Sequence, residues 1–105
     1  MVKIVRLLSG EEIIAKVTVE QTDEGTIFHL KDGCVLVPTQ EGKLMFVRWV
    51  PYAKESNGIP INKKDTIFCV DPATELEDHF INVVTNNLFV PPAKRIETPS
   101  LSLTS

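Results

Sequence analysis

The chain is poor in metal-binding and disulfide-forming residues. Only Cys34 and Cys69 occur in its 105 residues, and both lie inside apolar segments. This placement is typical of buried free thiols rather than of a disulfide framework. His29 and His79 are the other soft metal ligands, and no CxxC or HxxxH spacing is present. We therefore expect neither a metal nor any other cofactor.

Long apolar runs are also missing. None approaches the ~18 residues that a helix needs to cross a bilayer. The sequence has no charged segment followed by an apolar one at its start, as a secretion signal would require. We expect a protein without a membrane role in a reducing cytoplasm.

Positive charge is not in excess. The chain carries 11 Lys and Arg against 14 Asp and Glu, for a net charge of −3. Coating of nucleic acid by bulk electrostatics needs clustered positive charge, so the composition argues against that mode but allows a local basic patch.

Catalytic constellations are absent as well. Ser9-Gly10-Glu11 is no nucleophile elbow, because no His and Asp are arranged to serve the serine. The glycines stand singly and form no phosphate-binding loop. We expect that the protein is not an enzyme.

What the sequence does contain is β-strand pattern. Val2–Leu8 is apolar and β-branched, and a second segment follows the Ser9-Gly10 turn. Its alternation places four apolar residues on one face: Ile13, Ala15, Val17 and Val19. Alternation on both sides of a short glycine-containing turn predicts a β-hairpin.

Three further strands are predicted after this hairpin. One spans residues 26–37, with a bend or bulge at Lys31-Asp32-Gly33, and ends at Pro38. The others span residues 43–50 and 66–70, and residues 52–64 between them read as a long loop or projecting hairpin. The sequence thus predicts five strands.

The period then changes to that of a helix. Asp71-Pro72 is a typical helix start, with Asp as the N-cap. An apolar stripe follows, formed by Leu76, Phe80, Val83 and Val84. We expect one helix over residues 72–86 within a domain spanning residues 1–90, and a poorly ordered tail over residues 91–105.

The strands at 43–50 and 66–70 are apolar on both faces. An antiparallel strand with one solvated face should alternate. One short helix cannot cover all of this surface, so we expect part of it to be an oligomer interface. The candidates are Leu44, Met45, Phe46, Val47, Ile67, Phe68 and Cys69. A monomer whose two layers cover both faces is the alternative.

One grouping combines basic and aromatic residues around Trp49. Aromatic rings can stack on bases while Arg and Lys bind phosphates. The candidate nucleic-acid ligands are Arg48, Tyr52, Lys54, Lys63 and Lys64. Alternatively, Trp49 is a core residue and the lysines cover a solvated hairpin.

Two resemblances bear on these patterns. The segment KIVRLLSGEEIIAKV, residues 3–17, resembles the opening of the Sm/LSm small barrel, and the strands at 43–50 and 66–70 resemble its last two strands. Together with VPYAK, INKKDTIFCVDP and ELEDHF, the same segment is similar to an uncharacterised family of short proteins from tailed marine phages, especially cyanophages.

The Sm resemblance implies an SH3-like barrel of five antiparallel strands, here with one C-terminal helix, that forms a homo-oligomeric ring. In Sm-like rings the last two strands join neighbouring subunits edge to edge. The implied function is binding of nucleic acid, with single-stranded RNA as the leading ligand and single-stranded DNA as the other. The phage resemblance implies a role in phage or host RNA or DNA processing in the cytoplasm of an infected bacterium. If subunits form a ring, the lysines of one loop repeat around it and become multivalent.

Two loops depart from the Sm pattern. Residues 21–25 are acidic and lack the Asn of a uridine-binding loop, and residues 52–64 lack an Arg-Gly pair. The alternative function is therefore a structural or protein-interaction module without a nucleic-acid role.

Overall fold

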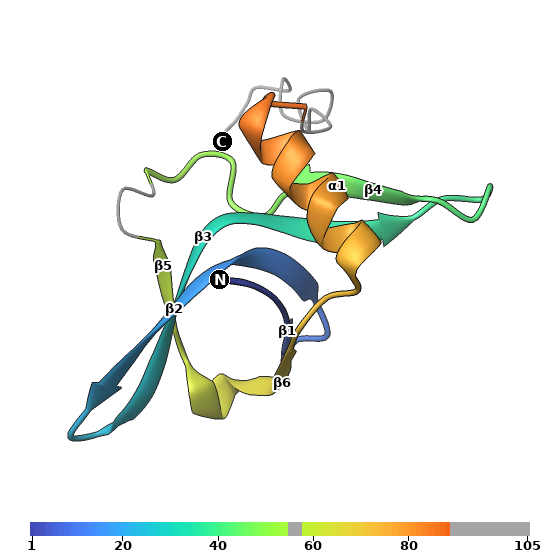
Figure 1. The fold of residues 1–105 in the computed structure, drawn as a ribbon. Coiled ribbons are helices and arrows are strands. Elements are labelled where there is room, and N and C mark those ends of the chain that lie inside the picture. Colours follow the sequence, from blue (N-terminus) through green and yellow to red (C-terminus); the bar gives the residue numbers. More distant parts are fainter. Residues whose placement is uncertain (55–57, 89–105) are drawn as a thin grey trace, which may run out of the picture.

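The computed structural model describes residues 1–54 and 58–88 of the chain (Figure 1). In order, these form β1 (Val2–Leu7), β2 (Glu12–Thr22), β3 (Gly25–Pro38), β4 (Leu44–Arg48), β5 (Ile59–Asn62), the 3₁₀ helix η1 (Lys63–Asp65), β6 (Thr66–Val70) and α1 (Thr74–Thr85). The mostly β architecture with one helix is confirmed. The predicted tail, residues 91–105, and the last two residues of the predicted domain lie outside the described residues.

The strands form one antiparallel sheet in the order β4-β3-β2-β1-β6, and β5 pairs with the first half of β3. The η1 turn leads the chain from β5 to β6, and the Leu8 amide donates to the Asp65 carbonyl over 3.0 Å. The sheet therefore curls into a half-barrel (Figure 1). A small curled sheet was predicted, but the described residues contain six strands instead of five.

The opening hairpin is present as predicted, with Val5 opposite Ile13. Val19, predicted to lie on the core face, is 57% exposed. At Val19, β2 pairs with β3 but has passed the end of β1, so no strand lies on its other side.

The predicted irregularity at residues 31–33 is a β-bulge. Ile14 pairs with Cys34 but Lys16 pairs with Lys31, so Ala15 alone faces two residues of β3. Asp32 takes the left-handed conformation, with φ of 57°. A Cβ on Gly33 would lie 3.2 Å from Trp49 Cε3, so only glycine lets the indole pack this closely. Trp49 accordingly packs against the core, as the alternative reading held.

The interpretation of residues 52–64 as a loop or projecting hairpin was wrong for residues 59–62. These form β5, where Ile61 pairs with Phe28 and packs against the barrel interior. The strand is short and contains Pro60, which cannot donate a ladder hydrogen bond. Lys63 and Lys64 consequently lie on η1, held against the barrel by β5 and β6, rather than on a free loop.

Both faces of the sheet carry a core. The inner cluster fills the curl: Val5, Ile13, Ala15, Val17, Phe28 and Leu30. The outer cluster lies between the sheet and α1: Val2, Ile14, Cys34, Phe46, Phe80 and Val83. Leu76 and Val84 pack against the outer cluster, so the predicted helical stripe is confirmed in full. Because both faces of β2 are covered, Ile13 and Ile14 are both fully buried although they are neighbours.

The helix begins two residues later than predicted. Its N-cap is Ala73, whose side chain makes no capping hydrogen bond. Asp71 is not the N-cap, because its carboxylate accepts a hydrogen bond from the Lys3 ammonium across β1 and β6. The first turn of α1 therefore lacks a side-chain acceptor for its free amides.

Supplying that acceptor should stabilise the protein. We expect Ala73→Thr to be more stable than the isosteric Ala73→Val by about 0.5–2 kcal/mol, because only the threonine oxygen can accept from the first-turn amides. Urea unfolding of the two variants measures the difference. Equal unfolding midpoints would show that the helix does not start at Thr74.

Candidate functional site

Three described strands have a free edge: β5, which pairs only with β3, and the two strands at the ends of the sheet. β4 and β6 stand at opposite ends of the strand order, and the outer edge of each pairs with no other described strand. Each edge presents backbone amide and carbonyl groups that can pair with a strand of another chain.

The candidate interface residues lie on these two strands. Leu44, Met45, Phe46 and Val47 belong to β4, and Ile67, Phe68 and Cys69 belong to β6. Ile67 and Leu44 are 56% and 42% exposed. Met45, Val47, Phe68 and Cys69 are half-buried. Phe46 is only 3% exposed, because α1 covers it, with the His79 ring 4.8 Å away. Phe46 therefore contributes to the core of its own chain.

The pairing register fixes which face each side chain occupies. Directly opposed residues of neighbouring strands point to the same face of a sheet. Val70 pairs with Ile4, which packs on the outer cluster, so Val70 lies on the α1 face. Cys69 pairs with Val5 and lies on the inner face. Apolar side chains thus flank the free edge of β6 on both faces.

The candidate nucleic-acid ligands do not form one patch. Arg48 stands at the end of β4, opposite Cys34, while η1 directly follows Asn62, which is opposite Ile27. Cys34 and Ile27 are seven positions apart along β3, or about 23 Å of strand. Arg48 is thus separated from Lys63 and Lys64 on η1.

The remaining two candidates follow β4. Tyr52 is 87% exposed and Lys54 is also exposed. Figure 1 places this stretch of chain at the far side of the molecule from η1. The sequence grouping therefore resolves into two basic sites, one after β4 and one on η1.

Of these two basic sites, the lysines on η1 are the more available to bind a ligand. Both are exposed, and neither forms an ion pair with another described residue. By contrast, Lys16 is paired with Asp32 at 3.3 Å. The turn between β2 and β3 carries Asp23 and Glu24, both exposed, and would repel phosphate.

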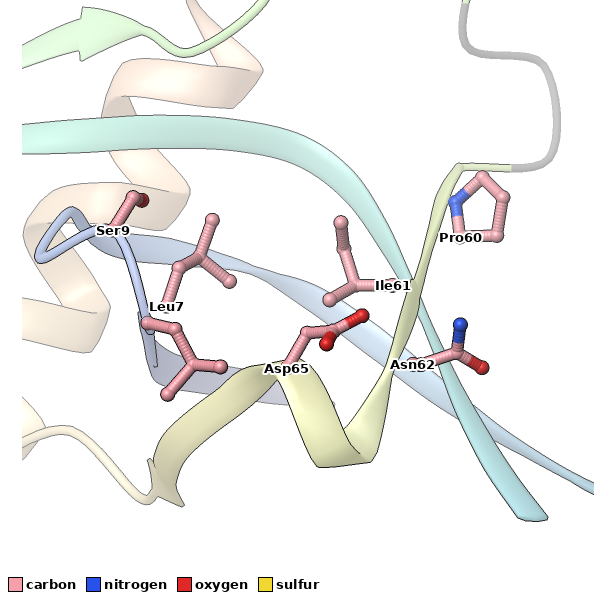
Figure 2. A pocket seen from close by; sticks show the side chains of 7 residues that line it. Leu7, Ser9, Pro60, Ile61, Asn62 and Asp65 are labelled. Atoms are coloured by element: carbon pink, nitrogen blue, oxygen red, sulfur yellow. The ribbon is translucent and has the colours of Figure 1, made fainter.

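A pocket of about 370 Å³ lies beside η1 (Figure 2). We call it the η1 pocket. Its apolar lining comes from Leu7 at the end of β1, from Leu8 directly after it, and from Pro60 and Ile61 of β5. Ser9, Asn62 and Asp65 add polar groups. In Figure 2 the Asp65 carboxylate is turned toward Ile61.

A second hollow of about 440 Å³ lies between β4 and the start of α1. Leu44, Phe46 and Leu76 make it largely apolar, and Glu75 and His79 lie at its helical side. It adjoins the free edge of β4.

The Cys69 thiol is half-buried and has a perturbed pKa. Burial raises the pKa of the Cys69 thiol, and the positive charges of Lys3 and Lys63 oppose this shift only in part. The hydrogen bond to Asp71 raises the pKa of Lys3. Cys69 is therefore a protonated thiol at neutral pH and a weak nucleophile. Among the described residues, no group of three or more His, Cys, Asp or Glu side chains could hold a metal ion.

Sequence reasoning missed Asp65 and the whole η1 pocket. The alternation of Ile59 and Ile61 between Gly58 and the lysines was the available indication of a strand, and the pocket follows once β5 is placed.

The described part of the chain contains no helix with the length and apolarity needed to cross a membrane. No protein-family model matches the sequence, and no curated protein matches it at a significant level. The proposed function therefore rests on the fold and its surfaces.

Proposed function

We propose that this chain is an Sm-like module that joins copies of itself into a ring, with the β4 edge of one copy pairing with the β6 edge of the next. The observation that carries the proposal is the presence of two unpaired edges at opposite ends of one sheet. The exposed Leu44 and Ile67 on these edges would be buried by such pairing. Backbone pairing gives affinity, and the flanking apolar side chains add to it.

Pairing of two different edges is a heterologous contact. Such contacts produce a closed ring when the rotation between neighbours closes, and a filament otherwise. The twist between paired strands would rotate each copy relative to its neighbour, as a closed ring requires. The hollow between β4 and α1 adjoins this seam, so side chains of the next β6 could extend the outer cluster.

We further propose that the ring binds single-stranded nucleic acid, RNA in the first instance, through η1. Lys63 and Lys64 are exposed and adjacent, and a ring would repeat the pair once per subunit. This multivalency is how a chain of net charge −3 could still bind phosphates.

Binding should depend on the η1 lysines. We expect Lys63→Glu combined with Lys64→Glu to weaken binding of single-stranded RNA strongly, and to reduce the salt dependence by about 0.7 in log–log slope per lost phosphate contact. Fluorescence anisotropy titrations at several salt concentrations measure both quantities. Light scattering should show unchanged assembly, because η1 lies outside the β4 and β6 edges.

The matched control is Lys31→Glu combined with Lys43→Glu, which makes the same change in net charge at exposed positions away from η1. If both double variants weaken binding equally, overall charge and not η1 governs it. If the parent binds neither RNA nor single-stranded DNA at ~50 mM salt, a condition that favours phosphate contacts, the protein is an interaction module without a nucleic-acid role.

A further inference from the structure

The η1 pocket has the dimensions and walls of a small-molecule site. Its volume of about 370 Å³ falls in the range of ligand pockets. Apolar side chains face each other across it, with Leu7 on one side and Ile61 of β5 on the other (Figure 2), and Leu8 and Pro60 also line the pocket. Facing apolar walls suit a flat ring, since bases taken out of a stack are held between apolar or aromatic side chains.

The pocket has one carboxylate, that of Asp65, whose backbone is held in place. The Asp65 carbonyl accepts the Leu8 amide over 3.0 Å, which ties the Asp65 backbone to the pocket wall. The Asp65 carboxylate has no hydrogen-bond or ion-pair partner among the described residues. It can therefore accept two parallel hydrogen bonds from a ligand.

The charges outside the pocket are opposite to the charge inside. Successive residues of a 3₁₀ turn point about 120° apart, so Lys63 and Lys64 project away from the direction that Asp65 takes. A ligand that donates hydrogen bonds at one end and carries negative charge at the other matches this arrangement. A basic peptide would satisfy Asp65 but would be repelled by the two lysines.

The geometry points to a guanine base of single-stranded nucleic acid in the η1 pocket. Guanine presents two adjacent donors, N1–H and the N2 amino group, to a carboxylate. Adenine and cytosine present one amino group beside an acceptor nitrogen, and uracil presents one N–H between two acceptors. Lys63 and Lys64 then bind the flanking phosphates. This inference rests on the proposed nucleic-acid function and adds a base preference to it.

The test compares a ten-residue oligouridine with the same strand carrying one central guanine. By anisotropy, the parent should bind the guanine strand about tenfold more tightly, within the range of a good bidentate base contact. Asp65→Asn should remove this preference, because its amide replaces one acceptor with a donor. Its affinity for oligouridine should not fall, since no phosphate contact is lost.

Asp23→Asn is the control, because it removes the same charge from an exposed turn outside the pocket. It should keep the guanine preference. If the parent binds both strands equally, or Asp65→Asn keeps the preference, the pocket assignment is overturned while nucleic-acid binding stands. If the parent binds neither strand, the proposed function fails and the inference fails with it.

Discussion

Replacing Phe80 with alanine is expected to lower the free energy of unfolding by about 3–5 kcal/mol. Phe80 is fully buried and is the largest such side chain in the described part of the chain. It contacts the outer cluster from α1, with its ring centroid 6.5 Å from that of Phe46. Truncation would leave a cavity between the helix and the sheet, which neither element can fill without moving.

Urea unfolding monitored by circular dichroism measures this loss. Ile81→Ala is the matched control, since Ile81 is the next residue of α1 but is exposed. Exposed substitutions of this kind change stability by about 0.5 kcal/mol or less. If Phe80→Ala and Ile81→Ala unfold at the same urea concentration, α1 does not pack on the sheet as described.

The second large effect concerns assembly. Ile67→Lys is expected to convert the oligomer into a monomer, because a lysine on an edge strand opposes pairing with another strand. Val19→Lys is the control: Val19 is also a β-branched strand residue, and its exposed fraction of 57% matches the 56% of Ile67. Because Val19 lies beyond the end of β1 and away from the β4 and β6 edges, Val19→Lys should remain oligomeric.

Leu44→Lys, on the β4 edge, should also give a monomer. Mixing it with Ile67→Lys should then yield dimers, because the intact β6 edge of the first variant can pair with the intact β4 edge of the second. Native mass spectrometry distinguishes these species. A mixture that stays monomeric, or a Leu44→Lys variant that stays oligomeric, would contradict pairing of β4 with β6.

Much of the fold could be predicted because it depends on local pattern. The opening hairpin, the bulge near Asp32 and the helical stripe around Phe80 each follow from periodicity or turn chemistry within a few residues. The exceptions depend on tertiary contacts. Asp71 pairs with Lys3, 68 positions away, and is thereby lost as a helix cap. β5 is four residues long and contains Pro60, so its alternation is a weak signal and the strand depends on its pairing with β3.

The candidate site was less accessible to sequence reasoning for the same reason. Lys54, Lys63 and Lys64 are near one another in sequence, but β5 and η1 carry the last two to the other side of the barrel. Asp65 becomes part of the η1 pocket only because the fold brings it beside Leu7 and Leu8, which are more than 50 positions earlier in the chain. The two doubly apolar strands, β4 and β6, are those that end the sheet, and their role as an oligomer interface stays a prediction.

Light scattering on the parent chain during size-exclusion chromatography at micromolar concentration tests the central claim of ring assembly most directly. We expect one species whose mass is a whole-number multiple, three or greater, of the 11.7 kDa subunit and does not grow with concentration. A single species of 11.7 kDa would contradict the ring, and with it the repeated display of the η1 lysines.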